Sequence, residues 1–102
     1  MNITIIGTGN MARGIGTRLL AGGNSVTLIG QQPGAAEELV GELRGAARSG
    51  ASVRATSGSG GIGGEVVILA VPYDAVASVV QQYADQLAGK IVVDITNPVD
   101  FS

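Results

Sequence analysis

The feature that most constrains the fold of this chain is a repeated alternation between short β-branched runs and longer stretches with helical spacing. The run from Val66 to Val71 has no polar alternation, which is typical of a parallel strand covered by helices on both faces. The pattern predicts an α/β fold: a doubly wound, mostly parallel sheet with strand order 3-2-1-4-5 and helices on both faces. The predicted strands are 2–6, 25–29, 51–55, 66–71 and 91–93, and the predicted helices are 10–21, Pro33 to about Ala47, and Asp74 to the residue before Gly89.

Spacing within these elements indicates which parts are buried. In the first helix Met11, Ile15 and Leu19 recur four residues apart and are expected to face the core. The strand at 51–55 is the most polar, which favours a place at a sheet edge. The Gly- and Ser-rich segment 57–64 is predicted to be a flexible connection, because no Lys-Ser or Lys-Thr follows it as a phosphate loop requires.

Composition excludes several classes of protein. With 102 residues, 45% of them hydrophobic, and a net charge of -2, the chain is large and apolar enough for one folded domain, expected to span residues 1–102. The absence of Cys and His excludes a disulfide framework, a thiol nucleophile, a zinc site and a Ser-His-Asp triad. Six scattered basic residues give no footprint for nucleic acid, and the longest apolar run is too short to span a membrane. No secretory signal is recognised, so we expect a cytoplasmic location.

The motif that points to chemistry is residues 7–12, Gly-Thr-Gly-Asn-Met-Ala, which reads G-x-G-x-x-A. It starts where the first predicted strand ends and opens the first predicted helix, inside a βαβ unit about 30 residues long, as dinucleotide binding requires. Gly7 permits the tight turn, Gly9 lets the backbone approach a pyrophosphate, and Ala12 lets the helix pack closely on the sheet. The free N–H groups and the positive dipole end of that helix favour phosphate. The motif predicts an NAD(P) site of the Rossmann type, against the simpler interpretation of a turn without a ligand.

The end of the second strand bears on the choice of cofactor. Domains selective for NAD usually place Asp or Glu there, but this chain reads Gly30-Gln31-Gln32, and its first acidic residue, Glu37, lies inside the next helix. Without that carboxylate a 2′-phosphate is not repelled, which favours NADP while leaving NAD possible. No Arg or Lys occupies the loop to pair with the phosphate. Thr8 and Arg13 are candidates, although Arg13 is expected to be a solvated residue of the first helical turn.

Two further segments are expected at the same crevice, because ligands of doubly wound sheets lie across the carboxyl ends of the strands. Val71 and Pro72 follow the fourth strand and are predicted to wall the nicotinamide half of the cofactor, although Pro72 equally suits the strand-to-helix turn. Asn97 and Pro98 follow the fifth strand, where Asn97 is placed to bond a ribose or carboxamide; an Asn-Pro turn also needs no ligand to explain it.

Residues 5–14, the Ala-Val-Pro turn at 70–72 and the Asp-Ile-Thr-Asn-Pro stretch at 94–98 resemble the F(420)-dependent NADP reductases, also called F(420)H2:NADP oxidoreductases. The resemblance covers nearly the whole chain, but only the N-terminal, NADP-binding half of that family. It implies a domain that holds NADP beside the deazaflavin coenzyme F(420), with Thr8 to Met11 on the pyrophosphate and Gly30, Gln31 and Gln32 at the adenosine ribose. Val71, Pro72 and Asn97 are then at the nicotinamide end.

Two departures from the family are visible. Members specific for NADP tend to carry a Ser/Thr-Arg pair after the second strand, where this chain has Gln31-Gln32. Members of the family also have a C-terminal half of about another domain's length. That half completes the deazaflavin pocket and usually forms the dimer contact. We therefore expect one cofactor-binding domain without the C-terminal half that the family's proteins have, either as a truncation or as a stand-alone module. We also expect an exposed apolar crevice that favours a homodimer.

Three functions follow from the sequence. Hydride transfer between two cofactors needs ring positioning more than a proton donor, which suits a chain without His. The alternatives are the NADP-binding domain of a pyrroline-5-carboxylate, imine or 3-hydroxyacid reductase, since the Gly-Asn-Met turn also occurs there, and a non-catalytic dinucleotide-binding module. No catalytic residue and no metal ligand is identified.

Overall fold

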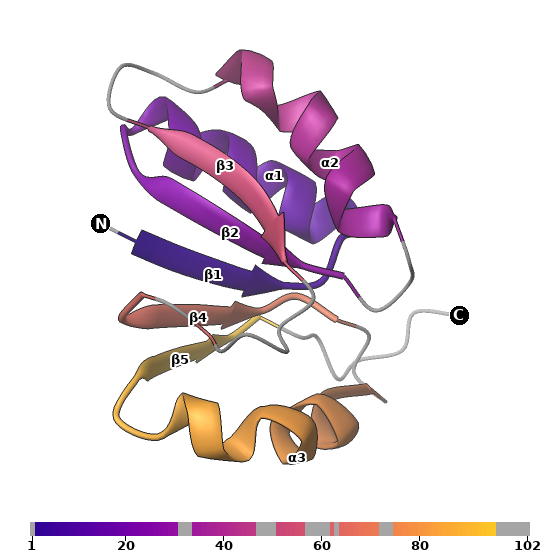
Figure 1. The fold of residues 1–102 in the computed structure, drawn as a ribbon, viewed down its shortest axis with the longest axis vertical. Coiled ribbons are helices and arrows are strands. Elements are labelled where there is room, and N and C mark those ends of the chain that lie inside the picture. The colour runs from indigo at the N-terminus through magenta and orange to yellow at the C-terminus, as the bar shows by residue number, and fades with distance from the viewer. Residues whose placement is uncertain are drawn as a thin grey trace.

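A computed structural model describes residues 2–30, 34–46, 51–56, 62, 64–71 and 75–95. Five strands form one sheet with the order β3-β2-β1-β4-β5, in which all neighbours are parallel, as predicted (Figure 1). The more polar strand predicted at 51–55 is at one edge of the sheet, as expected. The strands are β1 (Asn2–Ile6), β2 (Ser25–Ile29), β3 (Ser52–Thr56), β4 (Val66–Leu69) and β5 (Ile91–Asp94).

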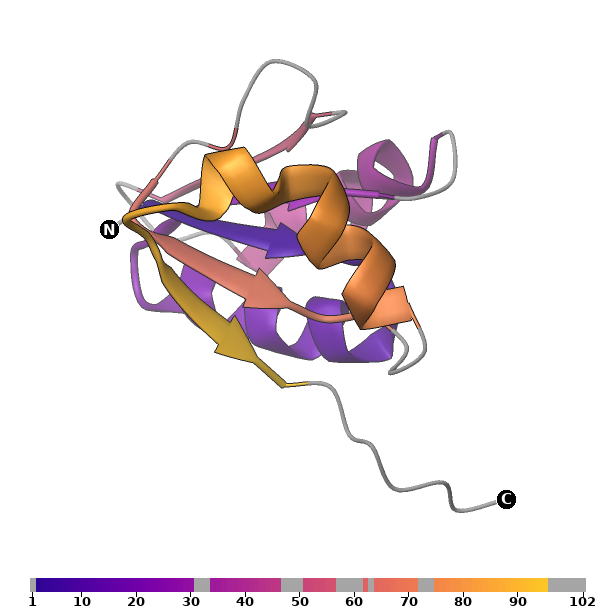
Figure 2. The same cartoon turned by 90° about the horizontal axis from the view of Figure 1, so that it is seen from below.

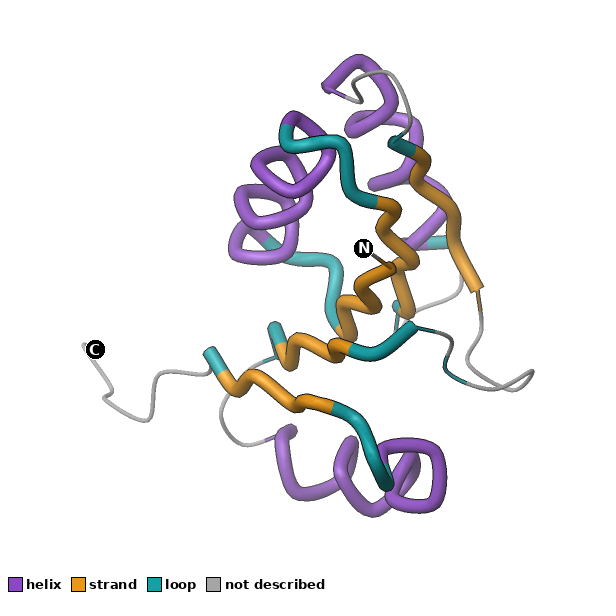
Figure 3. Tube along the Cα trace, turned by 90° about the vertical axis from the view of Figure 1, so that its left-hand side faces the viewer, coloured by secondary structure: helices purple, strands orange, loops and turns teal. Residues whose placement is uncertain are grey.

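Helices cover both faces of this sheet. The helices α1 (Asn10–Ala21) and α2 (Ala35–Leu43) lie side by side on one face, and a short 3-10 turn, η1 (Arg44–Ala46), continues α2. The helix α3 (Val76–Leu87) lies on the opposite face, beside β4 and β5 (Figures 1 and 2). A side view shows the resulting three layers, with α1 and α2 on one side of the strands and α3 on the other (Figure 3). The chain therefore has the doubly wound, Rossmann-type architecture expected from its sequence.

Each face of the sheet has its own hydrophobic core. One core lies beneath α1 and α2, and the other lies between the sheet and α3, where Val79 and Tyr83 pack against Ile6, Val67 and Leu69. Strands β1 and β4 contribute to both cores because successive side chains point to opposite faces. This burial on both sides explains why their sequences are nearly continuous apolar runs.

The buried face of α1 differs from the one predicted. Ile15 and Leu19 are partly buried and pack against the core, as predicted, but Met11 is 44% exposed. The fully buried residues of α1 are instead Ala12, Gly16 and Leu20. The reason is close packing: a Cβ on Gly16 would stand 2.9 Å from Leu43 Cδ1 of α2, so the smallest residues of α1 face its neighbours. Larger apolar residues flank that contact.

The ends of several elements also differ from the prediction. Strand β4 ends at Leu69, although the Ala70 N–H still donates to the Ile6 carbonyl at 2.8 Å. Helix α2 gives way to the 3-10 turn after Leu43. Helix α1 ends where predicted, since the N–H of Asn24 donates to Leu19 O and that of Gly23 to Leu20 O, as in a Schellman motif.

Among the described residues, no helix is both long and apolar enough to cross a lipid bilayer.

Candidate functional site

The candidate site begins at the turn from β1 to α1, which Gly7 makes possible. Gly7 has a φ of 129°, and a Cβ at this position would lie 2.1 Å from the Ala70 carbonyl oxygen. Its N–H donates to the Ile29 carbonyl at 2.9 Å. Gly7 is therefore wedged between the chain leaving β2 and the chain leaving β4, and only glycine fits. The turn brings the carboxyl ends of the three central strands together.

Gly9 is in a different situation, because nothing in the fold demands a glycine there. It is the N-cap of α1, its φ of -81° is open to any residue, and a Cβ would meet no atom within 4 Å. The helix that follows has no side-chain cap and no acidic residue in its first turn. The positive end of α1 therefore faces open space that a side chain at position 9 would fill. That is the arrangement a phosphate group requires.

The end of β2 lies beside this turn. A Cβ on Gly30 would stand 3.1 Å from the Ala36 backbone nitrogen and 3.3 Å from Thr8 Cγ2. The last residues of β2 are thus packed between the first turn of the site and the start of α2. The structure brings Thr8 and Gly30, both predicted site residues, into one place.

A hollow of about 170 Å³ opens next to them, between the first turns of α1 and the exposed side of α2. Two of its lining residues, Glu38 and Glu42, belong to α2, and no sequence spacing connects them to the glycine motif. The full lining is Thr8, Arg13, Ala35, Glu38, Leu39 and Glu42.

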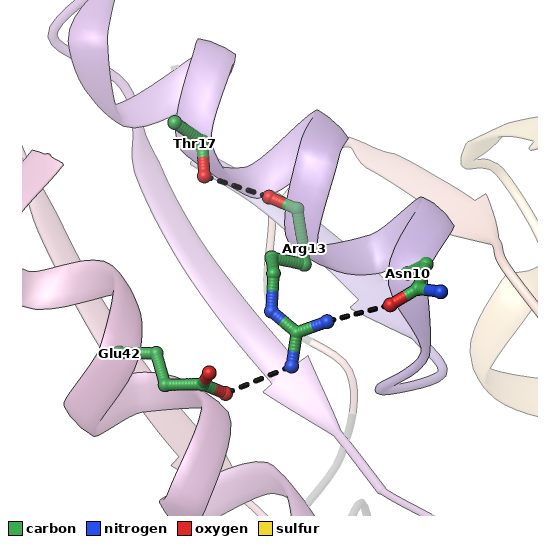
Figure 4. A network of polar contacts seen from close by, with 4 residues as sticks. All are labelled: Asn10, Arg13, Thr17 and Glu42. Atoms are coloured by element: carbon green, nitrogen blue, oxygen red, sulfur yellow. Dashed lines mark hydrogen bonds and ion pairs between the residues drawn. The ribbon is translucent and has the colours of Figure 1, made fainter.

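Arg13 is not the freely solvated residue that the sequence predicts. Its Nη1 donates to Asn10 Oδ1 at 2.7 Å, and its Nη2 donates to Glu42 Oε2 at 2.9 Å across the gap between α1 and α2 (Figure 4). The side chain is 43% exposed, and its backbone carbonyl accepts a bond from Thr17 Oγ1 at 2.8 Å. The partner Glu42 is 29 residues away along the chain. Only the packing of α2 beside α1 brings the two charges together.

The predicted nicotinamide end is described only in part. Val71 is 4% exposed and packs in the core between the sheet and α3. Its side chain therefore has little surface exposed to a ligand. Met11, which is predicted at the pyrophosphate, is exposed on the first turn of α1. The remaining predicted site residues lie outside the described residues: Gln31, Gln32, Pro72, Asn97 and Pro98.

Within the described part of the chain, no group of three or more acidic side chains is placed to hold a metal ion.

Comparison with known proteins identifies related families. The model of the family described as NADP oxidoreductase coenzyme F420-dependent matches residues 2–98. No curated protein matches the chain.

Solved structures with the same fold include dehydrogenases and reductases. Malate dehydrogenase from Salinibacter ruber is 16% identical with a TM-score of 0.81, over 98% of this chain and 38% of that one, and this identity shows the fold alone. Malate dehydrogenase from Aeropyrum pernix is 25% identical with a TM-score of 0.81, over 96% and 37% of the two chains. The imine reductase from Streptomyces aurantiacus is 29% identical with a TM-score of 0.66, over 94% and 32%. The chain spans less than two fifths of each.

Proposed function

Because the chain belongs to the family of coenzyme F(420)-dependent NADP oxidoreductases, we propose that it is the cofactor domain of an enzyme that transfers hydride between NADP(H) and coenzyme F(420) or a similar acceptor. At the coarser level the chain is an NAD(P)-binding Rossmann domain of the oxidoreductase class. The proposal includes the preference for NADP over NAD and the cytoplasmic location.

The observation that carries this proposal is the uncapped start of α1 beside Gly9. In a turn that serves only structure, a side chain at position 9 costs nothing sterically and a capping residue stabilises the helix. This chain has no side chain at position 9 and no capping residue, so the unpaired N–H groups of the first helical turn are left for a ligand. A pyrophosphate supplies the negative charge and the acceptors that they lack.

In this proposal different residues of the site contact different parts of the cofactor. Gly9 and Asn10 admit the pyrophosphate to the start of α1, and Thr8 and Gly30 lie beside the adenosine ribose, with Gln31 and Gln32 in the same loop. The nicotinamide end is proposed at Val71, Pro72, Asn97 and Pro98.

The nicotinamide ring supplies the hydride chemistry when NADP is bound. The protein positions the ring and keeps water away from it, and the chain contains no His that would serve a different, acid-catalysed reaction. This is why the transfer between two cofactors is preferred over reduction of a carbonyl.

A second candidate is the cofactor domain of an imine reductase. It is favoured by the 29% identity to the enzyme from Streptomyces aurantiacus, over 94% of this chain. Reduction of an imine calls for a proton donor beside the hydride, and the described site residues include none with that capacity. Assays of hydride transfer from NADPH, with F(420) and with a cyclic imine as alternative acceptors, distinguish the two.

Calorimetric titration of the chain with NADPH and, separately, with NADH tests the proposal first. We expect NADPH to bind at least about tenfold more tightly, equivalent to about 1.4 kcal/mol. Equal affinities contradict the NADP preference but keep a dinucleotide domain. Binding of neither nucleotide contradicts the proposed function of the chain.

A further inference from the structure

We propose that Arg13 binds the 2′-phosphate of NADP(H) and that Glu42 competes with this phosphate for it, so that the Arg13–Glu42 pair sets the preference between NADP and NAD. This inference rests on the proposed function and deepens it. In this assignment Arg13 has the role of the basic residue that is absent from the sequence at Gln31-Gln32.

The first argument is position. In dinucleotide-binding domains the group that selects between a 2′-hydroxyl and a 2′-phosphate lies just past the second strand. Here the end of β2 is packed between Thr8 and Ala36. The hollow lined by Thr8 and Arg13 opens at this junction. A phosphate on the ribose 2′-oxygen therefore points toward the space that Arg13 borders.

The second argument is charge. Arg13 is the sole basic residue that lines the hollow, as far as the described residues define it. A guanidinium has five N–H donors, and two of those of Arg13 are used by Asn10 and Glu42. The side chain lines the hollow and is 43% exposed, so the guanidinium is not enclosed by its two partners. The bond to Asn10 holds the guanidinium close to the glycine turn.

The third argument concerns Glu42. Its ion pair with Arg13 is about half exposed on both sides, and pairs of this kind contribute little to folding. The same carboxylate neutralises the charge that a phosphate needs and repels the phosphate itself. Glu38, which lines the same hollow, adds to the repulsion. A phosphate with nearly two negative charges and three acceptor oxygens is a stronger partner for Arg13 than one carboxylate, so it displaces Glu42 at a cost in affinity.

The alternative is that the pair only fastens α1 to α2. The two interpretations predict opposite results for Glu42→Gln. If the pair is structural, its loss loosens Arg13 and leaves or lowers the affinity for a 2′-phosphate. If Glu42 competes, its neutralisation raises that affinity.

Adenosine 2′,5′-bisphosphate and adenosine 5′-monophosphate are suitable probes, because they differ only in the 2′-phosphate and need no nicotinamide site. Each is titrated calorimetrically into the unmodified chain, Arg13→Gln, Glu42→Gln and Glu37→Gln. The last is a matched control, since Glu37 is exposed on the same helix and does not line the hollow. Circular dichroism melts of each variant confirm folding.

We expect Arg13→Gln to lower the affinity for the bisphosphate by about tenfold or more, because a charged hydrogen bond to the 2′-phosphate is lost, and to change the affinity for the monophosphate by less than about twofold. We expect Glu42→Gln to raise the affinity for the bisphosphate by about two- to fivefold, and Glu37→Gln to change the affinity for neither probe. Equal effects of Arg13→Gln on both probes, or unchanged or weaker bisphosphate binding by Glu42→Gln, overturn the inference. Bisphosphate binding without hydride transfer to any acceptor contradicts the proposed function and leaves the inference standing, whereas binding of neither probe overturns both.

Discussion

Gly7 and Gly9 lie two residues apart in one turn, and their surroundings differ in a way that separates folding from binding. Gly7 is enclosed by the ends of β2 and β4 and has a backbone conformation that other residues rarely adopt. Gly9 has an ordinary conformation and faces open space. At this scale the motif combines one glycine that the fold requires with another that the fold does not require and that we propose admits a ligand.

Replacement of Gly7 by Ala is therefore expected to destabilise the fold by about 3 kcal/mol or more, since it adds backbone strain to a collision with Ala70. Urea denaturation followed by circular dichroism measures the loss as a lower midpoint. A midpoint within error of the unmodified chain contradicts the steric argument.

Replacement of Gly9 by Ala is expected to change stability by less than about 1 kcal/mol, because the new methyl group meets nothing. It is expected to lower the affinity for NADPH by about tenfold or more, because the methyl group occupies the space through which the pyrophosphate reaches the start of α1. Gly41→Ala, at another open position on the exposed side of α2, is the control for both measurements. Unchanged NADPH affinity in the Gly9 variant argues against the proposed site.

At the scale of elements, the contact between α1 and α2 shapes the proposed adenosine side of the site. Gly16 lets the two helices approach until Leu43 lies over its backbone, and the same approach brings Arg13 within reach of Glu42. The close packing of two helices on one face of the sheet thus creates the charged hollow.

Gly16→Val is expected to destabilise the chain by about 1–3 kcal/mol, because it overpacks the buried contact with Leu43. Gly14→Val is the matched control on the same helix, since a Cβ at Gly14 has no neighbour within 4 Å. Chemical denaturation of both variants gives the comparison. Equal effects at the two positions contradict the importance of the helix contact.

At the scale of the whole molecule, β5 is an uncovered edge. Ile91, Val92 and Val93 are 63%, 41% and 39% exposed. The register pairs Ile91 with Val66 and Val93 with Ile68, so the apolar face beneath α1 continues onto β5, where these side chains are exposed. Exposed apolar edge strands favour association with another chain.

We therefore expect the chain to form dimers as its concentration rises, and Ile91→Lys to reduce this association. A charge at this position costs little folding stability, since most of the side chain is exposed. Sedimentation velocity over a concentration series measures the effect. A monomer mass that does not depend on concentration contradicts the expectation.

Local chemistry suffices for much of this architecture. The apolar runs of β1 and β4, the glycine turn and the helical spacing predict the five strands, their order and the start of α1, because each depends on neighbours in the sequence or on general rules of parallel sheets. Even there, the spacing of Met11, Ile15 and Leu19 misplaced the buried face of α1, because hydrophobicity alone does not show that Gly16 meets Leu43.

The charge pair at the proposed adenosine side was decided by the tertiary structure. Arg13 is predicted to be a solvated residue of the first helical turn, and no local pattern joins it to Glu42, 29 residues away. The same is true of Gly9, whose open surroundings become visible only when the helix and the strand ends are placed in space. The sequence determines which elements form and in what order, because those depend on short-range periodicity, whereas charge pairs and empty spaces depend on how the finished elements pack.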